Sequence, residues 1–259
     1  MIEIQGLRKT YGDKVAVHDL SLSVAEGEVF AFLGPNGAGK TTTIKILTGL
    51  LRADLGKVTV AGHDLSTHGM QARALMSYVP DEPYLYGKLT AREFLRMIGQ
   101  LYRMPAARVE ARIQAMTETF ELDEFIDNLT EGYSHGMKQR TVIAAALLHE
   151  PRLLVIDEPM VGLDPKSART VKDTLKALSR QQRMTVFMST HTLSVAEEVA
   201  DRIGILKHGK LVALGTLESI RQTHSNGGGG VQKLEDLFLD LTSSSEGIAV
   251  PSPRGRGPT

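Results

Sequence analysis

The chain has 259 residues, of which 42% are hydrophobic and 23% charged, a composition typical of a folded protein with one large domain or two small ones. Lysine plus arginine and aspartate plus glutamate balance at 30 each, so no net charge attracts the chain to nucleic acid or anionic lipid. The lack of cysteine excludes disulfide bonds and thiolate metal sites.

The longest apolar run, 142–148, is far too short to span a bilayer. Residues 1–5 lack the basic segment and apolar core of a signal peptide. We therefore expect a cytoplasmic protein, unless a partner holds it at a membrane.

Apolar and polar residues alternate over 2–24, the period of half-buried strands, with turns expected at 11–13 and 25–27. A further strand is expected at 58–60. This pattern predicts an antiparallel β layer at the N-terminus.

A glycine-rich loop follows an apolar strand at 29–33 and precedes a helix expected at 43–51. It has the spacing of a P-loop: Gly34, Pro35, Asn36, Gly37, Ala38, Gly39, Lys40, Thr41 and Thr42. Glycines let successive N–H groups point at one phosphate chain, Lys40 can reach the terminal phosphates, and the Thr41 hydroxyl can bind Mg²⁺. The alternative is a plain glycine-rich turn, but the strand before it and the apolar helix after it favour nucleotide binding at this loop.

Residues 84–150 have helical periodicity and predict a mainly helical insertion. Thr90 and Glu93 form a capping box at the start of the first helix, which we expect to end at 104–105. Two apolar stripes are predicted to face the core: Phe94, Ile98, Leu101 and Tyr102 in the first helix, and Val109, Ile113, Met116 and Phe120 in the second.

From 153 onward, strands and helices alternate. The continuous apolar run 153–156 is typical of a central parallel strand, and further strands are expected at 185–189 and on both sides of a turn at 208–209. The fold class predicted is therefore α/β: a P-loop (RecA-like) parallel-sheet core with an N-terminal antiparallel layer and the helical insertion. We place this domain at 1–223, and assign 224–259 to a Gly-rich linker, a short amphipathic helix and a disordered tail.

Two carboxylates, Asp157 and Glu158, directly follow the apolar strand. Asp157 can hold Mg²⁺ opposite Thr41, and Glu158 is a candidate base for an attacking water. The alternative is a polar cap on the strand end. Burying adjacent carboxylates without a cation is unfavourable, so a P-loop in the same chain favours the functional interpretation.

Five segments in this order resemble the ATP-binding subunit of an ABC transporter: the P-loop, 133–140, 153–159, 161–165 (the family's D-loop) and 189–191. The resemblance covers residues 1 to about 223. Residues 234–238 resemble, less specifically, subunits that serve two-component and often exporting transporters.

The resemblance implies ATP hydrolysis with Mg²⁺ by two such subunits, in a homodimer or heterodimer. Tyr11 would stack on adenine, and His191 would contact the γ-phosphate beside the base Glu158. Ser134 and Gly136 would reach the ATP of the opposite subunit, and Asp164 of the D-loop belongs to the same set of nucleotide-binding residues. The implied membrane partner is an integral permease, which would hold this subunit peripherally at the inner face of the membrane, and no nucleic acid is expected.

This chain departs from the family pattern at two places. In the signature segment, Tyr133, His135 and Met137 replace the usual Leu, Gly and Gln. After 78–80 the family usually carries Gln, where this chain has Asp81. We expect Asp81 on the metal side of the phosphates; the alternative is that it begins a turn with Pro83.

Two other functions compete with a transport ATPase. A soluble ABC ATPase acting on ribosomes or DNA usually carries paired ATPase domains in one chain or a long coiled-coil insert, and this sequence shows neither. A non-hydrolytic regulatory module is disfavoured because Glu158 and His191 are both present.

Overall fold

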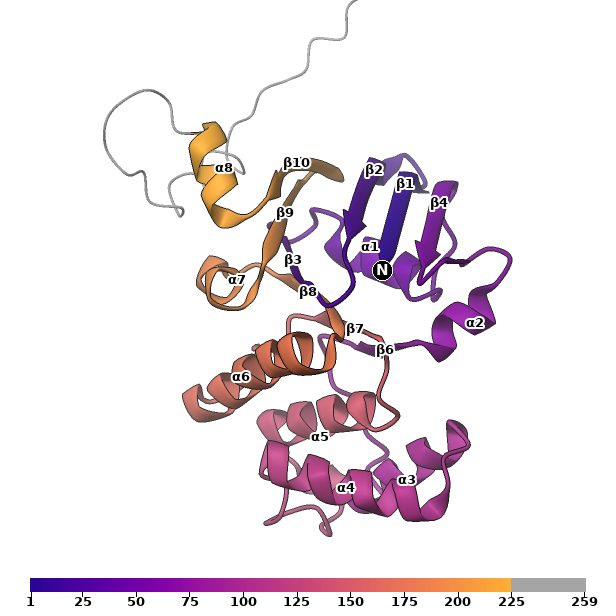
Figure 1. Cartoon of the computed structure of the whole chain (residues 1–259), viewed down its shortest axis with the longest axis vertical. Coiled ribbons are helices and arrows are strands. Elements are labelled where there is room, and N and C mark those ends of the chain that lie inside the picture. The colour runs from indigo at the N-terminus through magenta and orange to yellow at the C-terminus, as the bar shows by residue number, and fades with distance from the viewer. Residues whose placement is uncertain (225–259) are drawn as a thin grey trace, which may run out of the picture.

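The computed structural model describes residues 1–224 (Figure 1). Its strands are β1 (Ile2–Tyr11), β2 (Lys14–Val24), β3 (Val29–Leu33), β4 (Leu55–Val60), β5 (His63–Asp64), β6 (Met76–Val79), β7 (Leu153–Asp157), β8 (Thr185–Thr190), β9 (Arg202–Lys207) and β10 (Lys210–Gly215). Its helices are α1 (Lys40–Leu47), α2 (Gly69–Ala74), α3 (Ala91–Leu101), α4 (Ala106–Phe120), the 3₁₀ turn η1 (Thr130–Gly132), α5 (His135–Leu147), α6 (Pro165–Gln182), α7 (Leu193–Val199) and α8 (Leu217–His224).

The larger sheet has the strand order β10-β9-β3-β8-β7-β6. All its neighbouring strands are parallel except the edge pair β10–β9. Successive side chains of β3 alternate between two cores: Phe30 and Phe32 enter one, and Ala31 and Leu33 enter the other. A strand buried on both faces needs a continuous apolar run, which explains the sequence of β3.

The smaller sheet, β2-β1-β4-β5, is antiparallel and packs with α1 over one face of the larger sheet. In the core between them the rings of Phe30 and Phe187 stack 5.4 Å apart. The opposite face of the larger sheet is covered by helices, with α3 and α4 lying beyond α5, away from the antiparallel sheet (Figure 1). The predicted fold class is confirmed.

The bounds of one predicted helix differ from the structure, and some short elements were not predicted. The helix expected at 43–51 is α1, which begins at Lys40 inside the glycine-rich loop and ends at Leu47. Helix α2 and strand β6 were not predicted, because neither is long enough to show a clear period.

The end of the first predicted stripe was also wrong. Leu101 is 70% exposed and Tyr102 is 42% exposed, because α3 ends there, and the Tyr102 ring is partly covered by stacking on His149. The capping box is present: the Thr90 hydroxyl accepts a hydrogen bond from the Glu93 N–H, and the Glu93 carboxylate accepts one from the Thr90 N–H. The linker, amphipathic helix and tail predicted within 224–259 lie outside the described residues, apart from His224 at the end of α8.

The parallel strands place four loops at one edge of the larger sheet. The glycine-rich loop follows β3, Asp81 follows β6, Glu158 follows β7 and His191 follows β8. Ligands of open α/β sheets bind at the carboxyl ends of the strands, so this edge is where a site is expected. Within residues 1–224, no helix is both long and apolar enough to cross a bilayer.

Candidate functional site

The glycine-rich loop is fixed by close backbone packing. Gly39 has φ 106°, and a β-carbon there would lie 2.4 Å from the Ala16 carbonyl oxygen. A β-carbon on Gly34 would meet the Leu206 carbonyl oxygen at the same distance. Only glycine fits either position, so the loop closes tightly onto the N-terminal end of α1, where free N–H groups and the helix dipole favour an anion.

Lys40 lies at the centre of this loop. Its buried ammonium donates to the carbonyl oxygens of Gly34, at 2.6 Å, and Pro35, at 3.3 Å, and its Nζ lies 3.9 Å from Oε1 of Glu158. Burial lowers the pKa of Lys40, while the neighbouring carboxylates oppose that shift. An ammonium bound mainly to neutral carbonyls can be drawn to a phosphate, which offers full negative charge.

Thr41 and Asp157 meet beside the loop. The Thr41 hydroxyl donates to Oδ2 of Asp157 at 3.1 Å, and the Ser189 hydroxyl donates to Oδ1 of the same carboxylate. Burial raises the pKa of Asp157, although both hydroxyls act against that shift. A nearby cation would reverse the effect of burial, since it favours the charged carboxylate.

This pair fits Mg²⁺ by its chemistry. A hydroxyl and a carboxylate are hard oxygen ligands, and Mg²⁺ in nucleotide sites commonly takes one or two protein oxygens and completes its shell with phosphates and water. Among residues 1–224 there is no group of three or more His, Cys, Asp or Glu side chains that could hold a metal alone. The structure therefore suits a cation shared with a phosphate ligand.

Glu158 and His191 form the other wall of the site. Nδ1 of His191 lies 3.0 Å from Oε1 of Glu158, and the His191 N–H donates to Oε2 at 3.4 Å. Glu158 has a left-handed backbone with φ 49°, which is unfavourable for a side chain of its size. Its N–H donates to the Ser189 carbonyl oxygen at 3.2 Å, which holds this conformation and aims the carboxylate at Lys40.

Most of the predicted site residues line one open pocket of about 290 Å³. Its lining consists of Tyr11, Lys14, Ala16, Pro35, Asn36, Gly37, Gly39, Lys40, Thr41, Thr42, Asp81, Asp157 and Glu158. Tyr11 is half exposed at the rim, with Nζ of Lys9 5.7 Å from its ring centre. Asp81 lines the same pocket as Asp157, and its charge contributes to the raised pKa of Asp157.

Ser134, Gly136 and Asp164 are absent from that lining. Ser134 caps α5, accepting a hydrogen bond from the Met137 N–H at 3.3 Å. Asp164 caps α6, accepting from the N–H groups of Lys166 and Ser167, both at 3.0 Å. A β-carbon on Gly136 would lie 3.7 Å from the Gly162 carbonyl oxygen, so the signature segment and the D-loop lie against each other.

The sequence interpretation missed three residues of the site: Lys14, Ala16 and Ser189. Ser189 is the informative one. Strands β7 and β8 pair in parallel with Asp157 opposite Ser189, so these two polar residues meet at the carboxyl ends of the strands. A polar residue at the same end of two adjacent buried strands is the signal that could have found it.

Comparison with known proteins agrees with this geometry. The family model described as ABC transporter matches residues 17–161. The chain is 39% identical over 216 residues to the linearmycin resistance ATP-binding protein LnrL of Bacillus subtilis, covering 83% of this chain and 69% of that protein. It is 38% identical over 223 residues to the Nod factor export ATP-binding protein I of Bradyrhizobium diazoefficiens, covering 86% and 72%.

Solved structures show the same similarity. An ATP-binding subunit of an ABC transporter superimposes with a TM-score of 0.85 at 33% identity, covering 93% of this chain and 99% of the other. A dimer of the ATP-binding cassette MJ0796 in a post-hydrolysis state, bound to ADP and Pi, gives a TM-score of 0.78 at 27% identity, covering 84% and 99%.

Proposed function

Since the chain belongs to the ABC transporter family as an ATP-binding subunit with ATPase chemistry, we propose that it dimerises around two ATP molecules and drives transport through a separate membrane permease. The observation that carries this proposal is the convergence of Lys40, Thr41, Asp157 and Glu158 on one pocket at the carboxyl edge of the sheet. His191 joins them through Glu158.

Each residue of the pocket has a role that follows from its surroundings. Lys40 exchanges its carbonyl partners for the β- and γ-phosphates of ATP. Thr41 and Asp157 hold Mg²⁺, which supplies neutralisation of phosphate charge when bound. Glu158 takes the proton of the attacking water, and His191, beside it, orients the carboxylate and faces the γ-phosphate.

The proposed dimer explains why two predicted nucleotide-binding residues, Ser134 and Gly136, lie outside the pocket of their own chain. Ser134 and Gly136 stand at the N-terminal end of α5, a helix of 13 residues, outside the pocket of their own chain. A second subunit in head-to-tail orientation would bring this end to the γ-phosphate of the first. The similarity to a dimeric cassette bound to ADP and Pi supports this arrangement.

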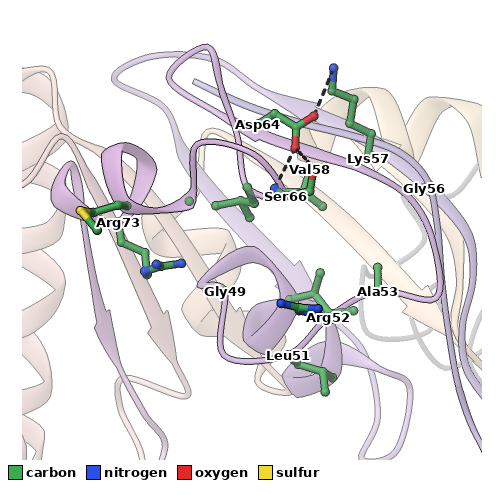
Figure 2. Close-up of a pocket in the computed structure, with 14 residues that line it drawn as sticks. Gly49, Leu51, Arg52, Ala53, Gly56, Lys57, Val58, Asp64, Ser66 and Arg73 are labelled. Atoms are coloured by element: carbon green, nitrogen blue, oxygen red, sulfur yellow. Dashed lines mark hydrogen bonds and ion pairs between the residues drawn. The ribbon is translucent and has the colours of Figure 1, made fainter.

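A second pocket is a candidate contact for the permease. It has a volume of about 540 Å³ and lies at the end of α1 opposite the nucleotide pocket. Figure 2 shows Arg73 of α2 and Arg52 of the loop after α1 on the same cavity, near Gly49. Lys57 also lines it but is paired with Asp64 at 3.4 Å, so two arginines supply the excess positive charge. The chemistry suits an acidic cytoplasmic segment of a membrane protein.

Two of the elements that line this pocket, α1 and α2, connect it to residues of the nucleotide pocket. Helix α1 runs directly from Lys40 to the pocket, and α2 leads through β6 to Asp81. Just after Asp81 two exposed tyrosines, Tyr84 and Tyr86, contact each other edge to face with ring centres 5.6 Å apart. Exposed aromatic pairs of this kind are typical of protein interfaces. A permease segment bound to the arginine-lined pocket and the tyrosine pair would contact the chain through α1, which begins at Lys40, and through the segment that follows Asp81.

The names of the relatives suggest the direction of transport. LnrL is named for linearmycin resistance, and the Bradyrhizobium protein for Nod factor export. We propose an export system for this chain as well.

Site-specific cross-linking tests the permease contact, because the natural chain has no cysteine. Met70→Cys places one thiol at a 79% exposed position on the arginine-lined pocket, and Leu214→Cys places one on β10 as a matched control. With a thiol-linked photo-cross-linker in cells of the native host, Met70→Cys should give an adduct with an integral membrane protein and Leu214→Cys should not. Adducts with ribosomal or nucleic-acid components instead would support the soluble alternative and refute the permease.

A further inference from the structure

The imidazole of His135 covers the α-carbon of Gly162. A β-carbon built on Gly162 would lie 2.3 Å from Nδ1, 2.9 Å from Cγ and 2.8 Å from Cε1 of His135. Three ring atoms at such distances mean that the ring occupies the space where any side chain at 162 would stand. Gly162 also has φ 72°, so glycine is required there both by backbone conformation and by the histidine. A glycine at position 135 would leave this space open.

The two residues belong to segments with different tasks. His135 is the first residue of α5, between Ser134 and Gly136. Gly162 lies in the D-loop, four positions after Glu158. The connecting loop is short and internally bonded, with the Val161 N–H donating to the Glu158 carbonyl oxygen at 3.2 Å. A shift of Glu158 in this loop would therefore move Gly162.

A second contact between the same segments is weaker. Nε2 of Gln139, one turn further along α5, lies 3.5 Å from the Pro159 carbonyl oxygen, at the limit of a hydrogen bond. Its buried Oε1 has no hydrogen-bond partner among residues 1–224. The histidine ring is thus the closer link between the start of α5 and the loop that follows Glu158.

From this geometry we infer that His135 is a positioning residue that couples the two ATP sites of the dimer. The inference rests on the proposed dimeric function. Ser134 and Gly136 of one subunit face the opposite ATP, while Glu158 of the same subunit serves its own ATP. The His135 ring on Gly162 joins these two groups within one chain, so occupancy of one site is transmitted to the signature residues at the other.

The test uses the purified full-length protein with Mg²⁺ and ATP. For each variant we would measure ATP affinity, the Hill coefficient and turnover of hydrolysis, and ATP-driven dimerisation. His135→Ala removes the ring and should lower turnover about 5-fold or more, the size of a typical coupling between sites, and bring the Hill coefficient to 1. ATP affinity of the monomer should stay unchanged. His135→Gln, whose planar amide can still cover Gly162, should recover a large part of the cooperativity.

A double-mutant cycle isolates the contact. Gly162→Ala should impair turnover by displacing the ring. His135→Ala combined with Gly162→Ala should be no worse than the more impaired single variant, because both substitutions break the same contact. His68→Ala is the matched control and should behave as wild type, because this exposed histidine contacts the Thr67 hydroxyl and the His63 ring and lies outside α5 and the loop after Glu158.

Two results would overturn the inference: a wild-type Hill coefficient and turnover in His135→Ala, or strict additivity of the two substitutions. A wild-type protein that binds ATP but neither dimerises nor hydrolyses it would refute the proposed function itself. The two failures are therefore distinguishable.

Discussion

Glu158 and His191 face each other at the ends of adjacent parallel strands, with Oε1 and Nδ1 3.0 Å apart. The register of β7 and β8 brings these two residues together. Asp157 lies opposite Ser189, so the residues that follow the two strands emerge side by side at the same edge of the sheet. The strained backbone of Glu158 turns its carboxylate toward both His191 and Lys40. A carboxylate held between a histidine and a lysine is well placed to receive a proton beside a phosphate.

Glu158→Gln should still bind Mg-ATP and hydrolyse it about 10²–10⁴-fold more slowly, the usual effect of removing a general base. The amide keeps the shape of the side chain but cannot accept the proton of water. A single-turnover assay with radiolabelled ATP measures the hydrolytic step directly. The variant should also accumulate an ATP-bound dimer, detected by size-exclusion chromatography, because slow hydrolysis no longer allows the closed dimer to open. Turnover close to wild type would remove Glu158 from the base role.

Lys40→Ala should affect the binding step, which precedes hydrolysis, and abolish tight nucleotide binding. The Lys40 ammonium lies within the glycine-rich loop, and its hydrogen-bond partners are two carbonyl oxygens that a phosphate can replace. Equilibrium binding of a fluorescent ATP analogue is the measurement. Lys45→Ala, on the exposed side of the same helix, is the control and should bind normally. Equal affinity in Lys40→Ala and wild type would contradict the phosphate role.

Residue pattern alone predicted the parts of this fold that are locally encoded. The double-sided burial of β3 follows from five consecutive apolar residues, and the start of α3 follows from the Thr90–Glu93 capping box. The spacing of the glycine-rich loop can likewise be recognised locally, although its tight packing depends on Ala16 and Leu206. Recognising these three features needs no knowledge of distant contacts.

The remainder depends on contacts between distant segments. The hydrogen bond from Ser189 to Asp157 exists only because β7 and β8 are paired in one register. The exposure of Leu101 depends on where α3 runs past the core, which its own apolar spacing does not reveal. The packing of His135 on Gly162 joins two segments separated by a helix and a strand, so no periodicity could have indicated it.

Stability should fall between pH 6.5 and about 4 because of His149. Its ring is stacked on Tyr102 with centres 3.5 Å apart, and burial lowers its pKa to about 4. Below pH 6.5 the His149 imidazole is protonated in the unfolded chain but stays neutral in the folded chain. The free energy of unfolding therefore decreases as the pH falls. From pH 7.5 to 5.5 the loss attributable to this residue is about 1 kcal/mol, since one pKa unit corresponds to about 1.4 kcal/mol.

Urea unfolding of wild type and His149→Phe at pH 7.5 and 5.5 measures the contribution of His149 to the pH dependence of the free energy of unfolding. Phenylalanine keeps the stacked ring but cannot be protonated, so the variant should lose less stability over this interval than wild type does. This comparison cancels the contribution of the other histidines. An identical pH dependence in the two proteins would mean that the folded state accepts the His149 proton.

The last prediction concerns Asp81, where the family usually has Gln. Asp81 is exposed on the pocket wall, and within the described residues it has no hydrogen bond or ion pair that would explain it as a structural turn residue. The Asp81 charge repels the charge of the Asp157 carboxylate and so contributes to the raised pKa of Asp157. A cation between the two carboxylates would turn this repulsion into attraction, so Asp81 belongs on the metal side of the phosphates, in contact with Mg²⁺ directly or through a water.

Asp81→Ala should therefore raise the Mg²⁺ concentration needed for half-maximal ATPase rate by about 10-fold, comparable with the loss of an outer-sphere ligand partner. Asp81→Gln, whose neutral carbonyl can still bind the cation, should recover much of the activity. Glu82→Ala is the matched control, because adjacent residues of an extended loop point to opposite sides and Glu82 does not line the pocket. Mg²⁺ titrations at saturating ATP compare the four proteins. Superimposable curves for wild type and Asp81→Ala would make Asp81 the first residue of a turn with Pro83 and leave Thr41 and Asp157 as the only protein ligands proposed for the cation.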